Sequence, residues 1–236
     1  MRLSRSATEP LNSGPLGFAH RGLHGPGLLV ENSVPAFTAA IEHGAGIECD
    51  LRLTADEQIM VFHDADARRI CDDPAAIGQH TAAQLAHLQV GGCPIPTLRN
   101  LLERVHGRVA LLLEVKVAGD RGRWPAALAR LLDAYSGAFG VMSFDPLLVA
   151  MLNRHRPQWR RGLVIADRLP AWRRMAALYL ADPHFLAVET GAAVRPWVAQ
   201  ARTTRAVYCW TVRSRAQRRA LQPLTDALIW EADGGP

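Results

Sequence analysis

The chain has 236 residues, 49% of them hydrophobic and 21% charged, which excludes a largely disordered protein and allows one sizeable core. The formal net charge of +5 comes from arginines spread along the chain. No nucleic-acid-binding motif accompanies them, so we expect a solvated basic surface and no nucleic-acid partner. Residues 1–15 lack the apolar segment of a secretory signal, and no apolar run has transmembrane length. We therefore predict a flexible tail over residues 1–15, no stable membrane insertion and a cytoplasmic location.

Short apolar runs typical of strands alternate with helix-like stretches. The strand-like runs are 16–20, 46–53, 59–63, 109–117, 140–144, 162–166, 185–189, 206–212 and 227–230. The helix-like stretches are 33–43, 98–105, 124–135, 146–154, 171–180, 194–201 and 214–221. This alternation is typical of a parallel α/β fold. Residues 64–96 form a longer excursion, in which we expect a short helix over 81–88.

The pattern favours a closed barrel over an open doubly wound sheet. No Gly-x-Gly-x-x-Gly motif opens the first helix, and charged residues recur where strands end, as expected when loops converge over one barrel mouth. Residues 51–59 are too short for a crossover helix, so one of the nine runs is an accessory strand. We predict a single TIM-type (β/α)8 barrel over residues 16–236, with an insertion over the mouth at about 64–96.

The single lysine is the most informative residue. All other basic residues are arginine, whereas Lys116 follows an apolar run and shares one side of it with Glu114. Lysine is a compact point charge and arginine a planar fork, so the composition suggests that this position needs an ammonium group. Glu48 and Asp50 also share one face of their run, because side chains alternate along a strand. These carboxylates are expected to meet at strand ends.

Six short motifs occur in an informative order. They are His20-Arg21-Gly22, Glu31-Asn32-Ser33, Glu48-Cys49-Asp50, His63-Asp64, Ile95-Pro96-Thr97-Leu98 and Glu114-Val115-Lys116. Together they resemble the glycerophosphodiester phosphodiesterase family over roughly residues 16–215. Two departures stand out: Val30 replaces the usual Pro, and residues 226–231 occupy the place of the family's closing Thr-Asp strand. Because the sequence stops at Pro236, we expect the last barrel helix to be missing.

The resemblance implies that Glu48, Asp50 and Glu114 hold one divalent metal ion. Three converging carboxylates do not all stay ionised in a barrel mouth without a cation, and all-oxygen ligation suits Mg²⁺ or Ca²⁺. The alternative is a structural ion-pair network with Arg21 and Lys116.

The resemblance also implies that His20 and His63 are the general acid and base, roles that suit imidazoles titrating near neutral pH. Arg21 and Lys116 would bind the phosphate, and Trp210 would pack against the alcohol or belong to the core. Glu31 and Asn32 would orient the first loop or cap the helix that follows. The remaining histidines are expected at the surface or in loops: His24, His43, His80, His87, His106, His155 and His184.

The predicted activity is metal-dependent hydrolysis of small glycerophosphodiesters to an alcohol and glycerol 3-phosphate. By resemblance, the neighbouring glycerol hydroxyl attacks first and leaves a cyclic phosphate for water to open. One alternative is lysophospholipase D-like cleavage of a lysophospholipid or another phosphodiester. Another is a non-catalytic anion-binding barrel, against which the presence of both His20 and His63 argues. The oligomeric state is left open.

Overall fold

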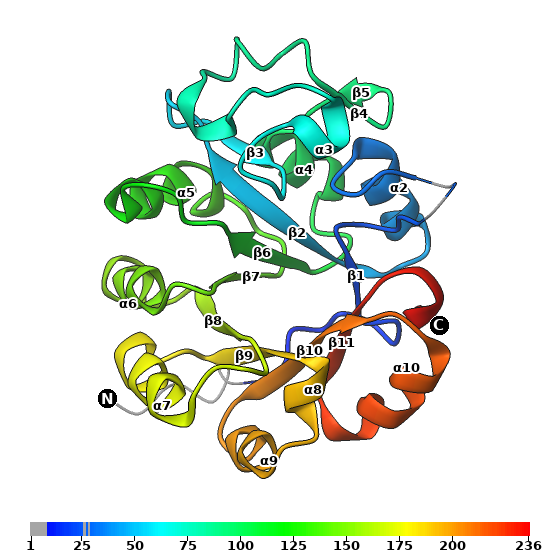
Figure 1. The fold of residues 1–236 in the computed structure, drawn as a ribbon, viewed down its shortest axis with the longest axis vertical. Coiled ribbons are helices and arrows are strands. Elements are labelled where there is room, and N and C mark those ends of the chain that lie inside the picture. Colours follow the sequence, from blue (N-terminus) through cyan, green and yellow to red (C-terminus); the bar gives the residue numbers. More distant parts are fainter. Residues whose placement is uncertain (1–8, 26, 28) are drawn as a thin grey trace.

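A computed structural model describes residues 9–25, 27 and 29–236, in which eight parallel strands form a closed barrel (Figure 1). These strands are β1 (Phe18–His20), β2 (Gly46–Leu53), β6 (Leu111–Val115), β7 (Phe139–Ser143), β8 (Arg160–Ile165), β9 (Phe185–Glu189), β10 (Ala206–Val212) and β11 (Ala227–Trp230). Strand β1 pairs with both β2 and β11, which closes the sheet. The predicted TIM-type barrel is therefore confirmed.

Helices cover the outside of the barrel (Figure 1). They are α2 (Val34–Glu42), α4 (Leu98–Val105), α5 (Trp124–Leu132), α6 (Pro146–His155), α7 (Ala171–Ala181), α8 (Thr190–Ala193), α9 (Pro196–Arg202) and α10 (Arg215–Leu221), with the 3₁₀ turns η2 (Arg121–Arg123) and η3 (Gln222–Leu224). Local sequence fixes their starts. Ser33 accepts a hydrogen bond from the N–H of Ala36, and Thr97 forms a capping box with Asn100.

The excursion between β2 and α4 begins with the accessory strand β3 (Ile59–Val61), which runs antiparallel to β2 as the short connection requires. It continues through α3 (Arg68–Cys71), η1 (Ile77–Gln79) and the hairpin of β4 (Gln89–Val90) with β5 (Cys93–Pro94). The helix expected over 81–88 is wrong, because residues 82–87 form turns. Leu85 and Leu88 have helical spacing, but eight residues are too few for a helix without strong support, and turns bury both leucines in a local core.

Aromatic and aliphatic side chains fill the barrel interior below the mouth. Phe18, Phe185 and Tyr208 pack there, and Gly162 gives the Phe185 ring room, since a Cβ at residue 162 would lie 2.1 Å from that ring. Leu11 joins this core, and its N–H donates to the Tyr208 hydroxyl at 2.8 Å. Leu11, in the segment 1–15 predicted as a flexible tail, is thus packed into the barrel core. Residues 1–8 of that segment lie outside the described residues.

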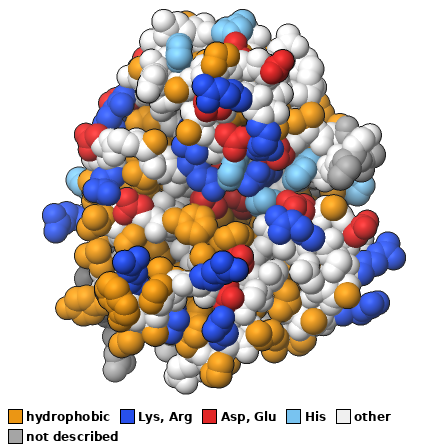
Figure 2. Space-filling view, in the orientation of Figure 1, with side chains coloured by type: hydrophobic (Ala, Val, Ile, Leu, Met, Phe, Trp, Pro, Cys, Tyr) orange, Lys and Arg blue, Asp and Glu red, His pale blue; other side chains and the backbone are white. Residues whose placement is uncertain are grey.

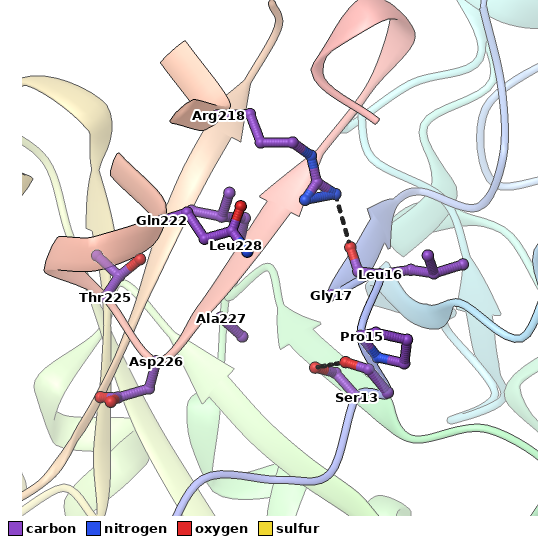
Figure 3. A pocket seen from close by; sticks show the side chains of 11 residues that line it. Ser13, Pro15, Leu16, Gly17, Arg218, Gln222, Thr225, Asp226, Ala227 and Leu228 are labelled. Atoms are coloured by element: carbon purple, nitrogen blue, oxygen red, sulfur yellow. Dashed lines mark hydrogen bonds between the residues drawn. The ribbon is translucent and has the colours of Figure 1, made fainter. Parts of the chain in front are cut away.

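The junction of β1 and β11, where the barrel closes, is stabilised by a hydrogen bond from α10 as well as by strand pairing. Arg218 donates to the carbonyl of Leu16 at 2.8 Å (Figure 3). The indole of Trp230 donates to the same carbonyl at 2.7 Å. After β11, residues 231–236 contain the 3₁₀ turn η4 (Ala232–Gly234). Across the described part of the chain, no helix combines the length and apolar character needed to cross a bilayer.

Candidate active site

Three carboxylates meet at the carboxyl ends of neighbouring strands. Glu48 and Asp50 lie on β2, and the register of β2 with β6 sets Asp50 beside Glu114. The intervening Cys49 points into the outer core and is fully buried. One ligand atom from each of the three carboxylates lies within 4.8 Å of the others. The predicted acidic triad is therefore brought together.

The electrostatics of this triad favour a bound cation. Glu48 is 1% exposed, and no described residue donates a hydrogen bond to its Oε1 atom. Burial, reinforced by the charges of Asp50 and Glu114, raises the pKa of Glu48 well above its usual range. Burial likewise raises the pKa of Glu114. A divalent cation would reverse both shifts, and an all-oxygen donor set fits Mg²⁺ or Ca²⁺.

The ion-pair network offered as the alternative forms in part. Lys116 Nζ lies 3.0 Å from Asp50 Oδ1 and also pairs with Glu114 Oε1, while Arg21 Nε lies 3.1 Å from Asp50 Oδ2. Burial acts to raise the pKa of Asp50, but Lys116 and Arg21 hold it well below its usual range. Glu48 is stabilised less in its ionised form, because among the described residues its Oε2 atom accepts a single hydrogen bond, from the backbone N–H of Arg21 at 3.1 Å. The network therefore neutralises Asp50 without compensating all three carboxylates.

The loop after β1 is organised by Glu31 and Asn32, and the helix cap belongs to Ser33 instead. Glu31 Oε1 accepts from Arg21 at 2.7 Å, and Asn32 donates its side-chain N–H to Asp50 Oδ2 at 2.9 Å. The Asn32 N–H also donates to the Arg21 carbonyl at 2.9 Å. Of the two roles predicted for Glu31 and Asn32, orientation of the loop is confirmed.

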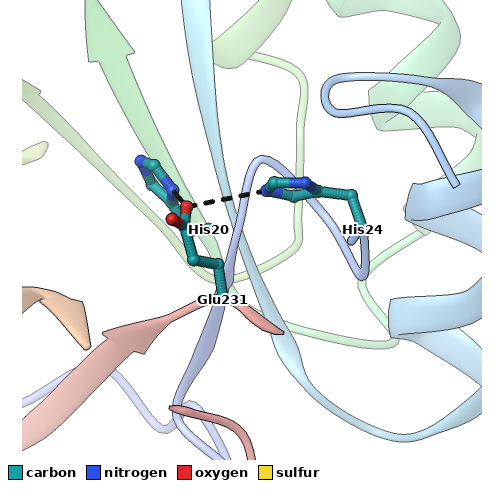
Figure 4. Close-up of side chains that lie close together, drawn as sticks. All are labelled: His20, His24 and Glu231. Carbon is teal, nitrogen blue, oxygen red and sulfur yellow. Dashed lines mark hydrogen bonds and ion pairs between the residues drawn. The ribbon is translucent and has the colours of Figure 1, made fainter. Parts of the chain in front are cut away.

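His20 is held by a carboxylate from the last strand. Its Nδ1 atom lies 2.5 Å from Glu231 Oε2, and Figure 4 shows His24 on the other side of that carboxylate. The hydrogen bond from His20 lowers the pKa of Glu231 to about 2, and Arg213 donates to its Oε1 at 2.6 Å. Because ionised Glu231 accepts a hydrogen bond from the Nδ1–H of His20, the other ring nitrogen, Nε2, faces the triad and lies 3.9 Å from Glu48 Oε2.

His63 has the same kind of support. Its Nδ1 atom lies 2.7 Å from Asp64 Oδ1, and Asp64 Oδ2 in turn accepts from Arg69 at 2.6 Å. Arg69 also binds Glu31, which links His63 to the loop that carries Arg21. Burial lowers the pKa of His63 below its ordinary value, which favours a neutral ring. Each histidine thus directs Nδ1 to a carboxylate, and no described residue hydrogen-bonds to its Nε2 atom.

Trp210 borders the mouth and is not sealed in the core. It is half-buried, and its indole N–H donates to the carbonyl of Ala187 at 3.0 Å. The ring stands edge-on to Phe144 with centroids 5.6 Å apart, and Lys116 Nζ lies 5.8 Å from the Phe144 centroid. These two aromatic rings form an apolar wall next to the charged centre.

Sequence reasoning listed Asp64 in the His63-Asp64 motif but gave it no role, and it did not single out the partner of His20. Glu231 is 211 positions from His20, and the signal was its place at the end of the closing strand. His24 and His184 lie in loops as expected, but His24 borders the site and His184 is buried.

A closed parallel barrel with acidic, basic and imidazole side chains at the carboxyl ends of its strands defines a class: a TIM-barrel protein with a cluster of ionisable side chains at the mouth. The chain belongs to the glycerophosphoryl diester phosphodiesterase family, whose profile matches residues 20–231.

Individual relatives agree with this assignment. A glycerophosphodiester phosphodiesterase of Bacillus altitudinis is 31% identical over 117 residues, 46% of this chain and 47% of that protein. For a relative from Bacillus subtilis, the match covers 43% of the relative's own length, and for the Bacillus altitudinis protein it covers 47%. The chain therefore spans about half the length of these two relatives.

Solved structures show the same fold. A phosphodiesterase of Oleispira antarctica in complex with its product sn-glycerol-3-phosphate has a TM-score of 0.81 at 21% identity, covering 93% of this chain and 94% of its own. A glycerophosphodiester phosphodiesterase of Thermotoga maritima has a TM-score of 0.75 at 25% identity, covering 90% and 92%.

Proposed function

We propose that this protein hydrolyses small glycerophosphodiesters to an alcohol and glycerol 3-phosphate with the help of one divalent metal ion. The observation that carries the proposal is the convergence of Glu48, Asp50 and Glu114 beside a histidine whose Nε2 atom faces them. Membership of the family supports it, as does the product bound to the Oleispira antarctica protein. The metal, Mg²⁺ or Ca²⁺, would be held by these three carboxylates.

Charge in the site suits a phosphodiester anion. When bound, the metal ion supplies Lewis-acid stabilisation of the phosphate oxygens. Arg21 and Lys116 add two cationic groups at the same mouth, and each is already aligned by Asp50. Their side chains bind the remaining phosphate oxygens and orient the phosphorus toward the two imidazoles.

The two histidines move the protons. One Nε2 atom accepts the proton of the glycerol 2-hydroxyl while that oxygen attacks phosphorus. The other Nε2 atom donates a proton to the departing alcohol, whose bond to phosphorus breaks, and a cyclic phosphate remains. Water then opens the ring with the proton transfers reversed, giving glycerol 3-phosphate. Ionised Glu231 and Asp64 accept hydrogen bonds from the Nδ1 atoms of the two rings, so that each ring exchanges its proton at Nε2.

The test is release of glycerol 3-phosphate from glycerophosphocholine, followed by a coupled assay. His20→Ala and His63→Ala should each lower kcat about a hundredfold or more. Titration calorimetry should show nearly unchanged metal affinity in both variants, because neither ring is proposed as a ligand. If the wild type turned over no glycerophosphodiester, the result would instead favour the alternative of a non-catalytic anion-binding barrel.

Two substrate comparisons sharpen the proposal. A glycerophosphodiester with hydrogen in place of the 2-hydroxyl should bind but not turn over, since the attacking oxygen is gone. Brisk hydrolysis of that analogue would show direct attack by water. Faster turnover of a long-chain lysophospholipid than of glycerophosphocholine would favour the lysophospholipase D-like alternative, which the exposed Phe144 beside the centre could serve. The cytoplasmic location stays a prediction.

A further inference from the structure

Helix α7 leaves large apolar side chains in solvent. Of its eleven residues, Ala181 is the one that is fully buried. Trp172, Met175 and Tyr179 are 68%, 67% and 92% exposed. Their spacing of three and four residues sets them on one side of the helix. Together with Arg173, these three residues are called the docking face below.

The helix that carries this face is positively charged, and the exposed Asp182 lies at its C-terminal end. Neither α6 nor α7 contains an Asp or Glu residue. Arg173 lies over the Trp172 ring at 5.1 Å and Arg174 over Trp197 at 4.3 Å, and neither pairs with a carboxylate among the described residues. Nearby Asp167 is already neutralised by Arg195 at 2.6 Å. The face therefore combines aromatic rings with the guanidinium group of Arg173, which pairs with no carboxylate among the described residues.

The apolar surface also extends toward the barrel mouth. Phe144 and Leu147 are 46% and 44% exposed and lie between β7 and the first turn of α6, which packs against α7. Figure 2 shows hydrophobic side chains beside the charged centre and over the lower left of the molecule, where Figure 1 places α7. A surface that contacts α7 would thus lie close to the rim of the proposed active site.

We propose that the docking face binds the protein peripherally to an anionic lipid surface. Exposed Trp and Tyr residues have an apolar body and a polar edge, which suits the headgroup region of a bilayer. Arginines beside them bind lipid phosphates and add electrostatic attraction. A second copy of the chain fits less well, because it would bring two arginine-bearing faces without carboxylates together. The proposal does not depend on the hydrolytic activity.

Vesicle sedimentation tests it, with phosphatidylcholine vesicles compared with vesicles that also contain phosphatidylglycerol. The wild type should bind the anionic vesicles, and the Trp172→Ser/Tyr179→Ser variant should bind them at least about fivefold more weakly. Leu224→Ser is the control, since Leu224 is 40% exposed on another part of the barrel. Arg173→Glu and Arg219→Glu change the net charge equally. A loss of vesicle binding in Arg173→Glu alone would therefore support binding through the docking face.

Three results would overturn the proposal. The first is a wild type that fails to prefer anionic vesicles. The second is an equal loss in Arg173→Glu and Arg219→Glu, which would mean that overall positive charge attracts the protein. The third comes from sedimentation velocity: a wild-type dimer that becomes a monomer in Trp172→Ser/Tyr179→Ser would show that a second copy covers this face. Glycerophosphocholine turnover is independent of all three.

Discussion

His20 Nδ1 and Glu231 Oε2 lie 2.5 Å apart across the seam that closes the barrel. His20 ends β1 and Glu231 follows β11, and these two strands pair directly. Closure of the barrel therefore positions the His20 ring, because the pairing of β1 with β11 brings the carboxylate of Glu231 next to it.

Removing this carboxylate should slow chemistry more than it weakens binding. Glu231→Ala should lower kcat for glycerophosphocholine about tenfold or more, because His20 can then rotate and adopt the other tautomer. KM and metal affinity should change little. Glu231→Gln keeps an acceptor and should retain more activity than Glu231→Ala. Arg213→Ala removes another partner of Glu231 and serves as the control for lost ion pairing. An unchanged kcat in Glu231→Ala would contradict this role.

The lone lysine should not tolerate arginine. Lys116 Nζ sits between Asp50 and Glu114, and the side chain is 16% exposed, which leaves little space for a planar fork. Lys116→Arg should lower kcat/KM at least about tenfold, or roughly 1.4 kcal/mol of transition-state stabilisation. Steady-state kinetics give the answer, with a thermal melt to confirm folding. Near-normal kinetics would mean that the single lysine is a compositional accident.

Buried His184 should make stability depend on pH. Burial, together with the nearby Arg161 guanidinium, lowers the pKa of His184 from 6.5 to about 4. Between these values the unfolded chain binds a proton that the folded protein does not, so stability falls as pH drops from 6.5 toward 4. His184→Gln should remove about 2 kcal/mol of the loss between pH 7 and pH 5. Urea unfolding at both pH values measures the free energy of unfolding. An equal loss of this free energy between pH 7 and pH 5 in the wild type and in His184→Gln would refute the prediction.

Local patterns predicted most of the strands because strand periodicity depends on neighbouring residues. Alternation along β2 was enough to set Glu48 and Asp50 on one face, and the expectation that strand ends converge brought Glu114 near them. The register that sets Asp50 beside Glu114 came only from the structure. The contact of Glu231 with His20 depends on how the last strand pairs with the first, and the local periodicity of the sequence carries no information on that pairing. Leu11 was hidden for a similar reason, since a single apolar residue in a polar segment finds its partner, Tyr208, only after the barrel has formed.

The central claim is that Glu48, Asp50 and Glu114 hold a metal ion on which hydrolysis depends. The most direct measurement is glycerol 3-phosphate release from glycerophosphocholine after exhaustive EDTA treatment and dialysis, before and after Mg²⁺ or Ca²⁺ is added. We predict that activity is lost on chelation and returns with the metal, and that Glu48→Gln does not recover under the same conditions. Full activity in the metal-free protein would contradict the account.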